Sequence, residues 1–317
     1  MGTYLVTGGA GFIGSNIVEE LVRRGKKVRV LDSFITGNIE NIKPFLRKVE
    51  LIRGDIRDRK ALNRALRGVT YVIHQAALRS VAKSVEDPFM TNDVNVNGTL
   101  NLLVASREHK VKRVVYASSS SAYGDAKVFP QKETHLPVPI SPYGVSKLAA
   151  ENYCVTFAKT FGLETVSLRY FNVFGPRQNP ESKYSAVIPM FIFKMLNGER
   201  PVVDWDGKQS RDFTFVKNVV EANLNACVVS GISGEVFNVA CGTTTSIIGI
   251  VNEINKVFKT CIKPVYAPKR AGDVRKTRAD ISKLKKSLRI KRFVHFEEGM
   301  RLTMDWFLEN RKDLRVS

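Results

Sequence analysis

Several patterns are missing from this sequence of 317 residues, and each absence excludes a class of protein. The four cysteines, Cys154, Cys227, Cys241 and Cys261, form no C-x-x-C pair, which favours free thiols over disulfides. The four histidines are scattered without metal-ligand spacing, so no metal site is predicted. No apolar run approaches the roughly 18 residues that a membrane helix needs. The first predicted strand begins almost at Met1, which leaves no room for a signal peptide, and we expect a cytoplasmic protein that does not enter a membrane.

Acidic side chains are also in short supply, because 50 Lys and Arg residues outnumber 30 Asp and Glu residues and leave a net charge of +20. An excess of this size is typical of proteins that bind nucleic acids or anionic surfaces. Many of the basic residues lie late in the chain, between Lys263 and Arg292. We interpret them as a solvated basic face and do not predict a nucleic-acid partner.

The first fourteen residues carry the main functional signal. Tyr4-Leu5-Val6 is a short apolar run of strand type, and a helical apolar pattern begins at Phe12-Ile13. Gly8, Gly11 and Gly14 punctuate this stretch with two residues between each pair. A strand, a glycine turn and a helix in this order predict dinucleotide binding, because glycines let the backbone approach a pyrophosphate. The N-terminus of the helix then offers unpaired N–H groups to the phosphate oxygens.

Polar residues at the ends of the next predicted strands extend this site. Asp32 follows the strand over 27–31 and lies 32 − 14 = 18 positions after Gly14, where an acidic residue hydrogen-bonds the adenine ribose. Its charge would repel the 2′-phosphate of NADP, so NAD is the predicted cofactor. Asp55 follows the third strand, where it either binds the cofactor or caps the next helix. Gln75-Ala76-Ala77 follow the fourth strand and suit a close backbone approach.

A candidate catalytic pair lies at the start of a later predicted helix, which opens at Ser141-Pro142. Tyr143 and Lys147 are four residues apart and therefore share one helix face. A lysine ammonium beside a tyrosine favours the phenolate and lowers its pKa from about 10, so that Tyr143 would act as a general base near neutral pH. The fifth strand, over 113–117, ends in the serines of 118–121, which are well placed to reach a ligand over the cofactor.

Together these features resemble the extended short-chain dehydrogenase/reductases, and among them the nucleotide-sugar 4-epimerases. The resemblance covers nearly the whole chain. It rests on TGGAGFIG at the glycine turn, GDI at Asp55, the serines before Tyr123-Gly124, the Tyr143/Lys147 pair, RYFNVFGP around Asn172, Arg211-Asp212-Phe213, Phe237-Asn238-Val239 and RAGDVRKT. It implies an α/β fold in which a doubly wound parallel (Rossmann) sheet is joined to a smaller C-terminal α/β substrate domain.

The resemblance also implies the reaction. Tightly bound NAD takes a hydride from C4 of the sugar while Tyr143 takes the hydroxyl proton, and the hydride then returns to the other face of the 4-keto sugar. The implied catalytic residues are Ser119, Tyr143 and Lys147. The implied cofactor contacts are Gly8, Gly11, Phe12, Ile13, Gly14, Asp32, Ser33, Gly37, Asn38, Asp55, Ile56, Gln75, Ala76, Ala77, Asn95, Tyr143, Lys147 and Tyr170. The implied substrate contacts are Arg79, Ser80, Val81, Ser119, Ser120, Ser121, Tyr143, Asn172, Val187, Ile188, Val203, Asp204, Arg211, Arg270, Asp273 and Thr277.

Departures from related enzymes narrow the implied substrate and reaction. Dehydratases of the family carry an Asp-Glu pair after the catalytic Thr, and UDP-xylose-forming decarboxylases carry Glu at the position of Ser121. This chain has Ser120 and Ser121 there, which disfavours loss of water or CO₂. Thr277 occupies the family's gate position, where a small residue admits an N-acetyl group. We expect activity on UDP-GlcNAc/UDP-GalNAc as well as UDP-Glc/UDP-Gal, with UDP-glucuronate as an alternative because Arg79 would meet a C6 carboxylate.

The expected architecture is an NAD-binding Rossmann domain over residues 1–170, with a return segment near 215–240, and a nucleotide-sugar-binding domain over 171–317. The resemblance implies a homodimer in which helices over 93–107 and 143–161 form a four-helix bundle.

Three other functions stay open. A net oxidoreductase of the same fold would release its cofactor, and Asp32 and the Arg211/Arg270 sites argue against a reductase that uses NADP. Another NAD-dependent nucleotide-sugar dehydratase or oxidoreductase of the same fold is a further alternative. A noncatalytic basic relative would bind RNA or protein partners, and the intact catalytic residues argue against it.

Overall fold

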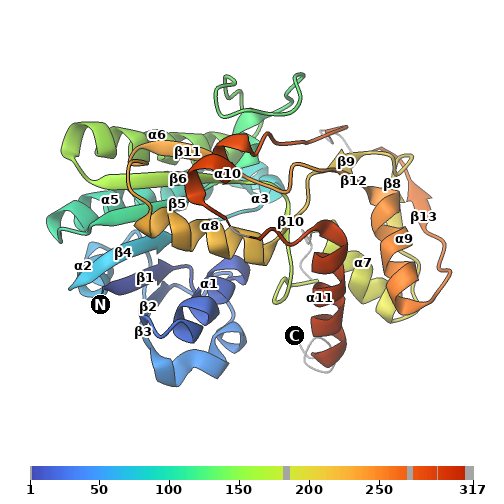
Figure 1. Cartoon of the computed structure of the whole chain (residues 1–317), viewed down its shortest axis with the longest axis horizontal. Helices are drawn as coiled ribbons and strands as arrows, with labels where there is room; N and C mark the ends of the chain where they lie inside the picture. Colours follow the sequence, from blue (N-terminus) through green and yellow to red (C-terminus); the bar gives the residue numbers. More distant parts are fainter. Residues whose placement is uncertain (1, 181–185, 270–273, 291, 311–317) are drawn as a thin grey trace.

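A seven-stranded sheet dominates the computed structural model of the chain, which describes residues 2–180, 186–269, 274–290 and 292–310 (Figure 1). The strand order is β11-β6-β5-β4-β1-β2-β3, and all neighbouring strands run parallel. The strands are β1 (Thr3–Thr7), β2 (Lys27–Asp32), β3 (Val49–Arg53), β4 (Val69–His74), β5 (Arg113–Ser119), β6 (Glu164–Tyr170) and β11 (Glu235–Val239). The order reverses between β1 and β4, where ligands bind in open α/β sheets. The predicted Rossmann sheet is confirmed.

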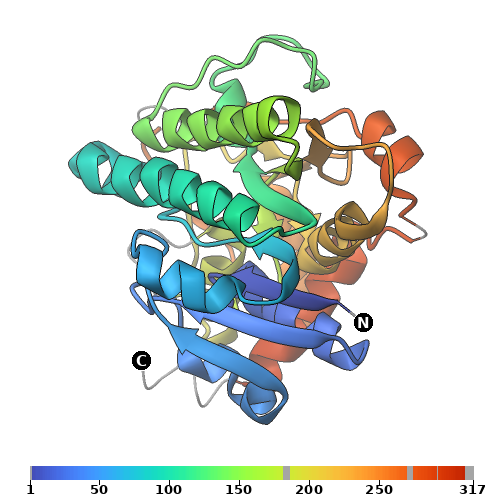
Figure 2. The same ribbon diagram turned by 90° about the vertical axis from the view of Figure 1, so that its left-hand side faces the viewer.

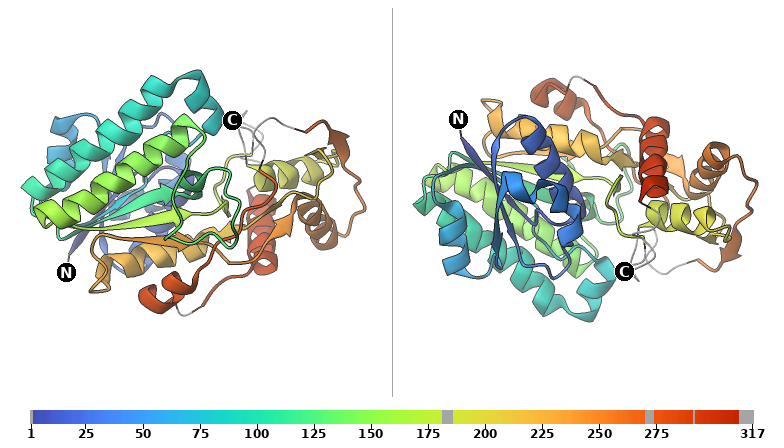
Figure 3. Two further views of the ribbon diagram at one scale, coloured as in Figure 1. Left: turned by 90° about the horizontal axis from the view of Figure 1, so that it is seen from above. Right: turned by 90° about the horizontal axis from the view of Figure 1, so that it is seen from below.

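Helices cover both faces of the sheet (Figure 3). One face carries α2 (Arg59–Leu66), α5 (Gly98–Glu108) and α6 (Pro142–Phe161), and the other carries α1 (Phe12–Arg23) and α8 (Val216–Val228). Every residue of β5 is buried as a result. This explains why the central strands read as continuous apolar runs and not as an alternating pattern.

The C-terminal part of the chain forms a smaller lobe, on the right in Figure 1. Its helices are α7 (Val187–Leu196), α9 (Ile247–Phe258) and α11 (Phe296–Glu309), while α10 (Ser282–Leu288) lies against β11. Its short strands pair as β7 (Val173–Phe174) with β10 (Thr214–Phe215), β8 (Val202–Asp204) with β13 (Val265–Ala267), and β9 (Ser210–Arg211) with β12 (Thr245–Ser246). One apolar core continues from beneath α1 and α8 into this lobe, and a second lies beneath α2, α5 and α6.

The chain passes from the sheet into the smaller lobe and back, because β11 pairs with β6. The division into domains at residue 170 stays a prediction. Within the described ranges, no helix is long and apolar enough to cross a membrane.

The helix expected over 93–107 begins earlier than predicted. Asp87 accepts the Met90 N–H at 2.9 Å and caps α4 (Pro88–Asn92), which runs through the π-helical turn η3 (Asp93–Asn97) into α5. The preceding helix, α3 (Val81–Glu86), ends at the same aspartate. Phe89 and Met90 expose 86% and 43% of their surface, so this part of the helix lacks the apolar periodicity on which the prediction depended.

Candidate active site

The turn after β1 leaves no room for side chains at its glycines. Gly8 has a φ of 66°, and a Cβ there would lie 2.7 Å from the backbone nitrogen of Ala76. A Cβ on Gly14 would lie 2.1 Å from the carbonyl oxygen of Gly8, so α1 packs directly on the turn. Gly11 is the N-cap of α1 and supplies no side chain to its first turn, which begins with Phe12 and Ile13. Such a helix start fits the pyrophosphate of NAD.

Asp32 closes this turn from the end of β2. Its carboxylate accepts N–H bonds from Ala10 and Phe34, both at 2.8 Å. Burial raises the pKa of Asp32, and the two backbone hydrogen bonds oppose that rise. The loop after β2 folds over it, since a Cβ on Gly37 would lie 2.6 Å from its Oδ1 and Asn38 N donates to Ala10 O at 3.0 Å. Ser33 belongs to the same loop, so the residues predicted for the adenine side lie together.

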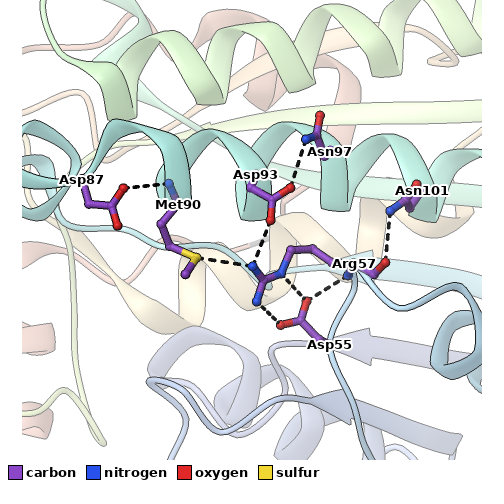
Figure 4. Close-up of polar contacts among 7 residues, drawn as sticks. All are labelled: Asp55, Arg57, Asp87, Met90, Asp93, Asn97 and Asn101. Atoms are coloured by element: carbon purple, nitrogen blue, oxygen red, sulfur yellow. Dashed lines mark hydrogen bonds and ion pairs between the residues drawn. The ribbon is translucent and has the colours of Figure 1, made fainter.

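The structure corrects one interpretation of Asp55. Asp58, and not Asp55, caps α2, because its carboxylate accepts the Lys60 N–H at 2.8 Å. Asp55 accepts three bonds from Arg57, at 2.8 Å from its backbone N, 3.0 Å from Nε and 2.8 Å from Nη2 (Figure 4). Arg57 Nη1 also reaches Asp93 Oδ2 at 2.9 Å. These bonds lower the pKa of Asp55 and fix its carboxylate at the carboxyl end of β3.

The π-helical turn η3 directs Asn95 towards the loop after β4. The Asn95 side chain accepts the Leu78 N–H at 2.8 Å and donates to Leu78 O at 2.9 Å. It also donates to Ser146 Oγ at 3.0 Å, and Ser146 in turn donates to Tyr143 O at 2.8 Å. Such turns occur often at functional sites. Here the turn ties the loop after β4 to the start of α6, while the neighbouring Ile56 is buried against α5.

A buried polar cluster holds the loop after β4. Gln75 Nε2 donates to the Tyr170 hydroxyl at 3.0 Å and to Asn223 Oδ1 at 3.2 Å, and Asn223 Nδ2 donates to Tyr170 at 2.7 Å. Ala76 N donates to Thr7 Oγ1 at 3.3 Å, and Ala77 follows it in the same loop. The structure therefore brings Gln75, Ala76, Ala77 and Tyr170 to the sheet edge that carries the glycine turn.

Ser119 and Tyr143 meet at the carboxyl end of β5. Ser119 is the last residue of that strand, and Tyr143 is the second residue of α6, whose start Ser141 caps by accepting the Gly144 N–H at 3.1 Å. The Ser119 side chain lies close enough to the Tyr143 phenol to lower its pKa. Ser119 Oγ also accepts the N–H of Ser121 at 3.1 Å and caps the 3₁₀ turn η4 (Ser120–Tyr123), which places Ser120 and Ser121 next to the pair.

The electrostatics of Tyr143 differ from the prediction. Burial raises the pKa of Tyr143 above its ordinary value, and the Ser119 hydrogen bond and the positive charge of Arg79 oppose this rise. The sequence predicted a pKa lowered by Lys147, but burial outweighs every opposing effect. The Lys147 ammonium instead lies 4.6 Å from the centre of the Tyr116 ring. The cation that acts on the Tyr143 phenol is therefore Arg79.

Arg79 lies just before α3, which Ser80 caps by accepting the Lys83 N–H at 3.2 Å. Its side chain is exposed, although the surrounding protein still lowers its pKa by partial burial. Val81, the first residue of α3, exposes 46% of its surface. This segment therefore presents a solvated cation close to Tyr143.

Asn172 and Thr277 meet in the smaller lobe. Asn172 Nδ2 donates to Thr277 Oγ1 at 3.2 Å and to Asp212 O at 3.1 Å, and the same Thr277 oxygen accepts the Asp212 N–H at 3.3 Å. The Asp212 carboxylate accepts N–H bonds from Cys241, Gly242 and Ala279 at 2.9, 3.0 and 3.1 Å. Asp212 therefore links the segment that carries Thr277 and Ala279 to the loop at Cys241 and Gly242 through hydrogen bonds.

The other predicted substrate residues lie on several elements of the same lobe. Val187 and Ile188 begin α7, while Val203 is buried on β8 and Asp204 ends that strand. Arg211 ends β9, and its Nη1 donates to Ser210 O at 3.0 Å. Arg270 and Asp273 lie outside the described residues.

Some residues that hold the site from behind were missed by sequence reasoning: Ser146, Glu151, Arg169 and Asn223. The position of Glu151 four residues after Lys147 was an available signal for a shared helix face. Asn223 lies in α8, far from every motif, and only the fold brings it to Tyr170.

The chain is similar to known enzymes over almost its whole length. The sequence profile of the NAD dependent epimerase/dehydratase family matches residues 4–240. A putative UDP-glucose 4-epimerase of Methanocaldococcus jannaschii is 40% identical over 315 residues, which cover 97% of this chain and 99% of the relative. The solved UDP-N-acetylglucosamine 4-epimerase of Methanobrevibacter ruminantium, in complex with UDP-N-acetylmuramic acid, is 40% identical with a TM-score of 0.93, and the match covers 98% of this chain and 99% of that one. The UDP-glucose 4-epimerase of Thermotoga maritima, solved with UDP-glucose, is 39% identical with a TM-score of 0.92 at the same coverage of 98% and 99%.

Proposed function

The chain belongs to the NAD-dependent epimerase/dehydratase family, and on that basis we propose that it is an isomerase that inverts C4 of UDP-hexoses through a transient 4-keto sugar. The proposed substrates are UDP-Glc/UDP-Gal and UDP-GlcNAc/UDP-GalNAc. The observation that carries the proposal is the meeting of Ser119, the last residue of β5, with Tyr143 at the start of α6, with Lys147 one helical turn further along that helix.

The residues around the glycine turn fit NAD. The start of α1 would hold the pyrophosphate, Asp32 the adenine ribose and Asp55 the adenine edge, while Lys147 would hold the ribose at the nicotinamide end. When bound, NAD supplies the acceptor and donor of the C4 hydride. The buried cluster of Gln75, Tyr170 and Asn223 positions the loop after β4 at the same sheet edge as the glycine turn.

Tyr143 would take the proton of the C4 hydroxyl and later return it. Ser119 would hydrogen-bond the same sugar oxygen, and its bond to Tyr143 already favours the ionised phenol. Arg79 acts in the same direction through its charge. Both interactions oppose the rise in the Tyr143 pKa that burial causes, which is the direction that a general base requires.

The smaller lobe would bind the nucleotide part of the substrate. Arg211, with Arg270, would pair with the pyrophosphate, since charge-assisted hydrogen bonds to phosphate are strong. Asn172 would hold the sugar-phosphate, and the uracil would lie among Val187, Ile188 and β8, with Asp273 at its ribose. The small side chain of Thr277 beside Asn172 supports acceptance of an N-acetyl group.

UDP-glucuronate is a second candidate substrate, and Arg79 is the observation that favours it. Arg79 is an exposed cation whose charge reaches the Tyr143 phenol. A C6 carboxylate near the catalytic pair would meet this charge. Arg79→Gln would then reduce turnover of UDP-glucuronate more than turnover of UDP-Glc.

One experiment tests the proposal. Purified protein is incubated without added cofactor with UDP-Glc, UDP-GlcNAc and UDP-glucuronate in separate reactions, and the 4-epimers are followed by NMR. Conversion of UDP-Glc to UDP-Gal and of UDP-GlcNAc to UDP-GalNAc is expected. Absence of epimers from all three substrates, in protein that contains NAD, would reject the epimerase assignment.

We also propose that the protein is a homodimer. Helices α5 and α6 lie side by side on one face of the molecule (Figure 2). Between them lies a groove of about 420 Å³ lined by Val104, Arg107, Glu108, Phe157 and Phe161, and Phe161 exposes 43% of its surface. A second copy would bury this apolar strip. Light scattering should give a dimer for the wild type and a monomer for Phe161→Glu, and an unchanged mass for the variant would contradict this interface.

A further inference from the structure

Three ionisable residues follow one another along the buried face of α6. Tyr143, Lys147 and Glu151 are spaced by four residues, so they lie one above the other on the helix. Lys147 and Glu151 keep only 3% and 2% of their surface exposed. Charged side chains are rarely buried to this extent unless they have partners. The mechanism proposed above assigns Tyr143 and Lys147 a role but leaves Glu151 without one.

Glu151 has a dense set of partners on the neighbouring strands. Its Oε1 accepts Arg169 Nη2 at 2.6 Å, and its Oε2 accepts Arg169 Nε at 3.0 Å and the Ser118 hydroxyl at 2.6 Å. Arg169 is itself buried on β6, and its guanidinium lies 4.6 Å from the centre of the Tyr123 ring. This bidentate pair fixes the carboxylate near the carboxyl ends of β5 and β6, one helical turn along α6 from Lys147.

Groups on several elements face Lys147. His74 on β4 and Tyr116 on β5 lie near the ammonium, while Cys154 and Glu151 follow it on α6. Burial lowers the pKa of His74 to about 3, and it raises the pKa values of Tyr116 and Cys154, so all three are neutral near pH 7. Among these groups, Glu151 is therefore the one that carries a negative charge. Arg169 reaches Glu151 from its other side and opposes it.

We propose that Glu151 is a positioning residue for catalysis, whose carboxylate is shared between the Arg169 guanidinium and the charge of Lys147. It keeps the lysine cationic in surroundings that otherwise favour the neutral amine. The proposal rests on the proposed function for its catalytic meaning, because Lys147 is proposed there to hold the ribose at the nicotinamide end. Burial lowers the pKa of Lys147 to about 7, so the lysine titrates in the pH range where a small change of field alters its charge.

The two partners of the ion pair have opposite effects on Lys147, and this provides the test. Glu151→Gln removes the negative charge, so Lys147 loses its proton at lower pH. Arg169→Gln removes a positive charge and leaves the Glu151 charge undivided, so Lys147 loses its proton at higher pH. Each shift should be about one pH unit, the size expected when one neighbouring charge is lost from a partly screened interior. A purely structural pair would not move the titration in opposite directions.

The titration is measured without turnover, by NMR of protein labelled with ¹³C at lysine Cε. The Lys147 signal is assigned by its absence in Lys147→Met. Because Glu151→Gln leaves Arg169 buried without its anion and is a strain on folding, the double variant Glu151→Gln/Arg169→Gln is compared with Arg169→Gln alone. That comparison isolates the Glu151 charge, and the double variant should titrate at the lower pH. Glu151→Asp keeps the charge and should titrate close to the wild type.

Activity gives the second readout. The alkaline limb of the kcat profile should move with the Lys147 titration in each variant, because loss of that proton weakens the proposed contact of Lys147 with the ribose at the nicotinamide end. An unchanged Lys147 titration across these variants, or shifts of the same sign in Glu151→Gln and Arg169→Gln, would overturn the proposal. If the Lys147 titration moves in opposite directions in the two variants but the protein epimerises no nucleotide sugar, the effect of Glu151 on Lys147 stands and the proposed function is rejected.

Discussion

The Asn172 side-chain amide donates a hydrogen bond to the Thr277 hydroxyl oxygen across 3.2 Å, joining two residues that are 105 positions apart in the chain. The same oxygen accepts the Asp212 N–H at 3.3 Å. The residue proposed to limit the size of the sugar therefore contacts the residue proposed to hold the sugar-phosphate. A bulkier side chain at 277 would enter the space next to Asn172.

Thr277→Tyr should selectively depress turnover of UDP-GlcNAc while UDP-Glc is still epimerised. The ring would occupy the volume that an N-acetyl group needs, and such exclusion acts on one substrate only. The ratio of the two kcat/KM values is the measurement. Thr277→Val is the matched control, since it removes the hydroxyl without adding bulk and should affect both substrates alike. An equal loss on both substrates in Thr277→Tyr would contradict the gate.

The sheet and the glycine turn could be predicted because local rules determine them. Gly8 and Gly14 leave no space for side chains, and Asp32 lies at the end of the strand that pairs with β1. These features depend on residues close in the sequence, and the apolar runs of the buried strands mark their positions. The extra helical turn of α4 escaped prediction because its apolar residues face solvent.

The electrostatics of the site could not be predicted, because they depend on burial and on contacts between distant segments. The Tyr143/Lys147 spacing correctly placed both residues on α6, but burial raises the pKa of Tyr143, and Arg79 reaches it from another segment. The sequence left Asp55 as either a cofactor contact or a helix cap. In the structure Arg57 binds its carboxylate and also reaches Asp93. Spacing along a helix identifies which side chains share a face, but it does not determine what the opposite strand presents to them.

Tyr143→Phe should retain bound NAD and lose at least about 100-fold in kcat, the lower range for removal of a general base. The phenyl ring preserves the packing at the start of α6 but cannot carry the C4 proton. NAD content after denaturation and kcat on UDP-Glc are the two measurements. Tyr153→Phe, on the exposed side of the same helix, is the control and should leave both unchanged. Full activity of Tyr143→Phe would remove Tyr143 from the proposed role of base.

Gly14→Ala should abolish NAD retention and lower the melting temperature. The added Cβ would lie 2.1 Å from the Gly8 carbonyl oxygen, so α1 must move away from the turn that it packs on. Overpacking of this kind costs about 1–3 kcal/mol of folding free energy or more. Gly249→Ala in α9 is the control, because its Cβ would meet only side-chain atoms, at 3.1 Å, far from the turn. Normal NAD content in Gly14→Ala would show that the turn tolerates the extra carbon.

The buried His74 should make stability fall as the pH is lowered below about 6.5, the ordinary pKa of histidine. His74 lies between Thr7 Oγ1, 2.7 Å from Nδ1, and Thr99 Oγ1, 3.0 Å from Nε2. Burial lowers its pKa to about 3, and the nearby charge of Lys147 adds to the effect. Between these two values the unfolded chain binds a proton that the folded chain does not, so the free energy of unfolding decreases as the pH falls.

Because of His74, the free energy of unfolding should be about 2 kcal/mol lower at pH 5 than at pH 7. The figure follows from the interval of about 1.5 units between the ordinary histidine pKa and pH 5, at about 1.36 kcal/mol per unit. Urea unfolding of the wild type, His74→Gln and His109→Gln at both pH values measures it. His74→Gln removes the titrating group from the core and should show the smaller pH dependence by that amount, even if it is less stable at pH 7. His109 is only partly buried at the end of α5, and its variant should follow the wild type. The same pH dependence in all three proteins would mean that His74 is protonated in the folded chain, which would place a second cation beside Lys147 and weaken the support that Glu151 gives it.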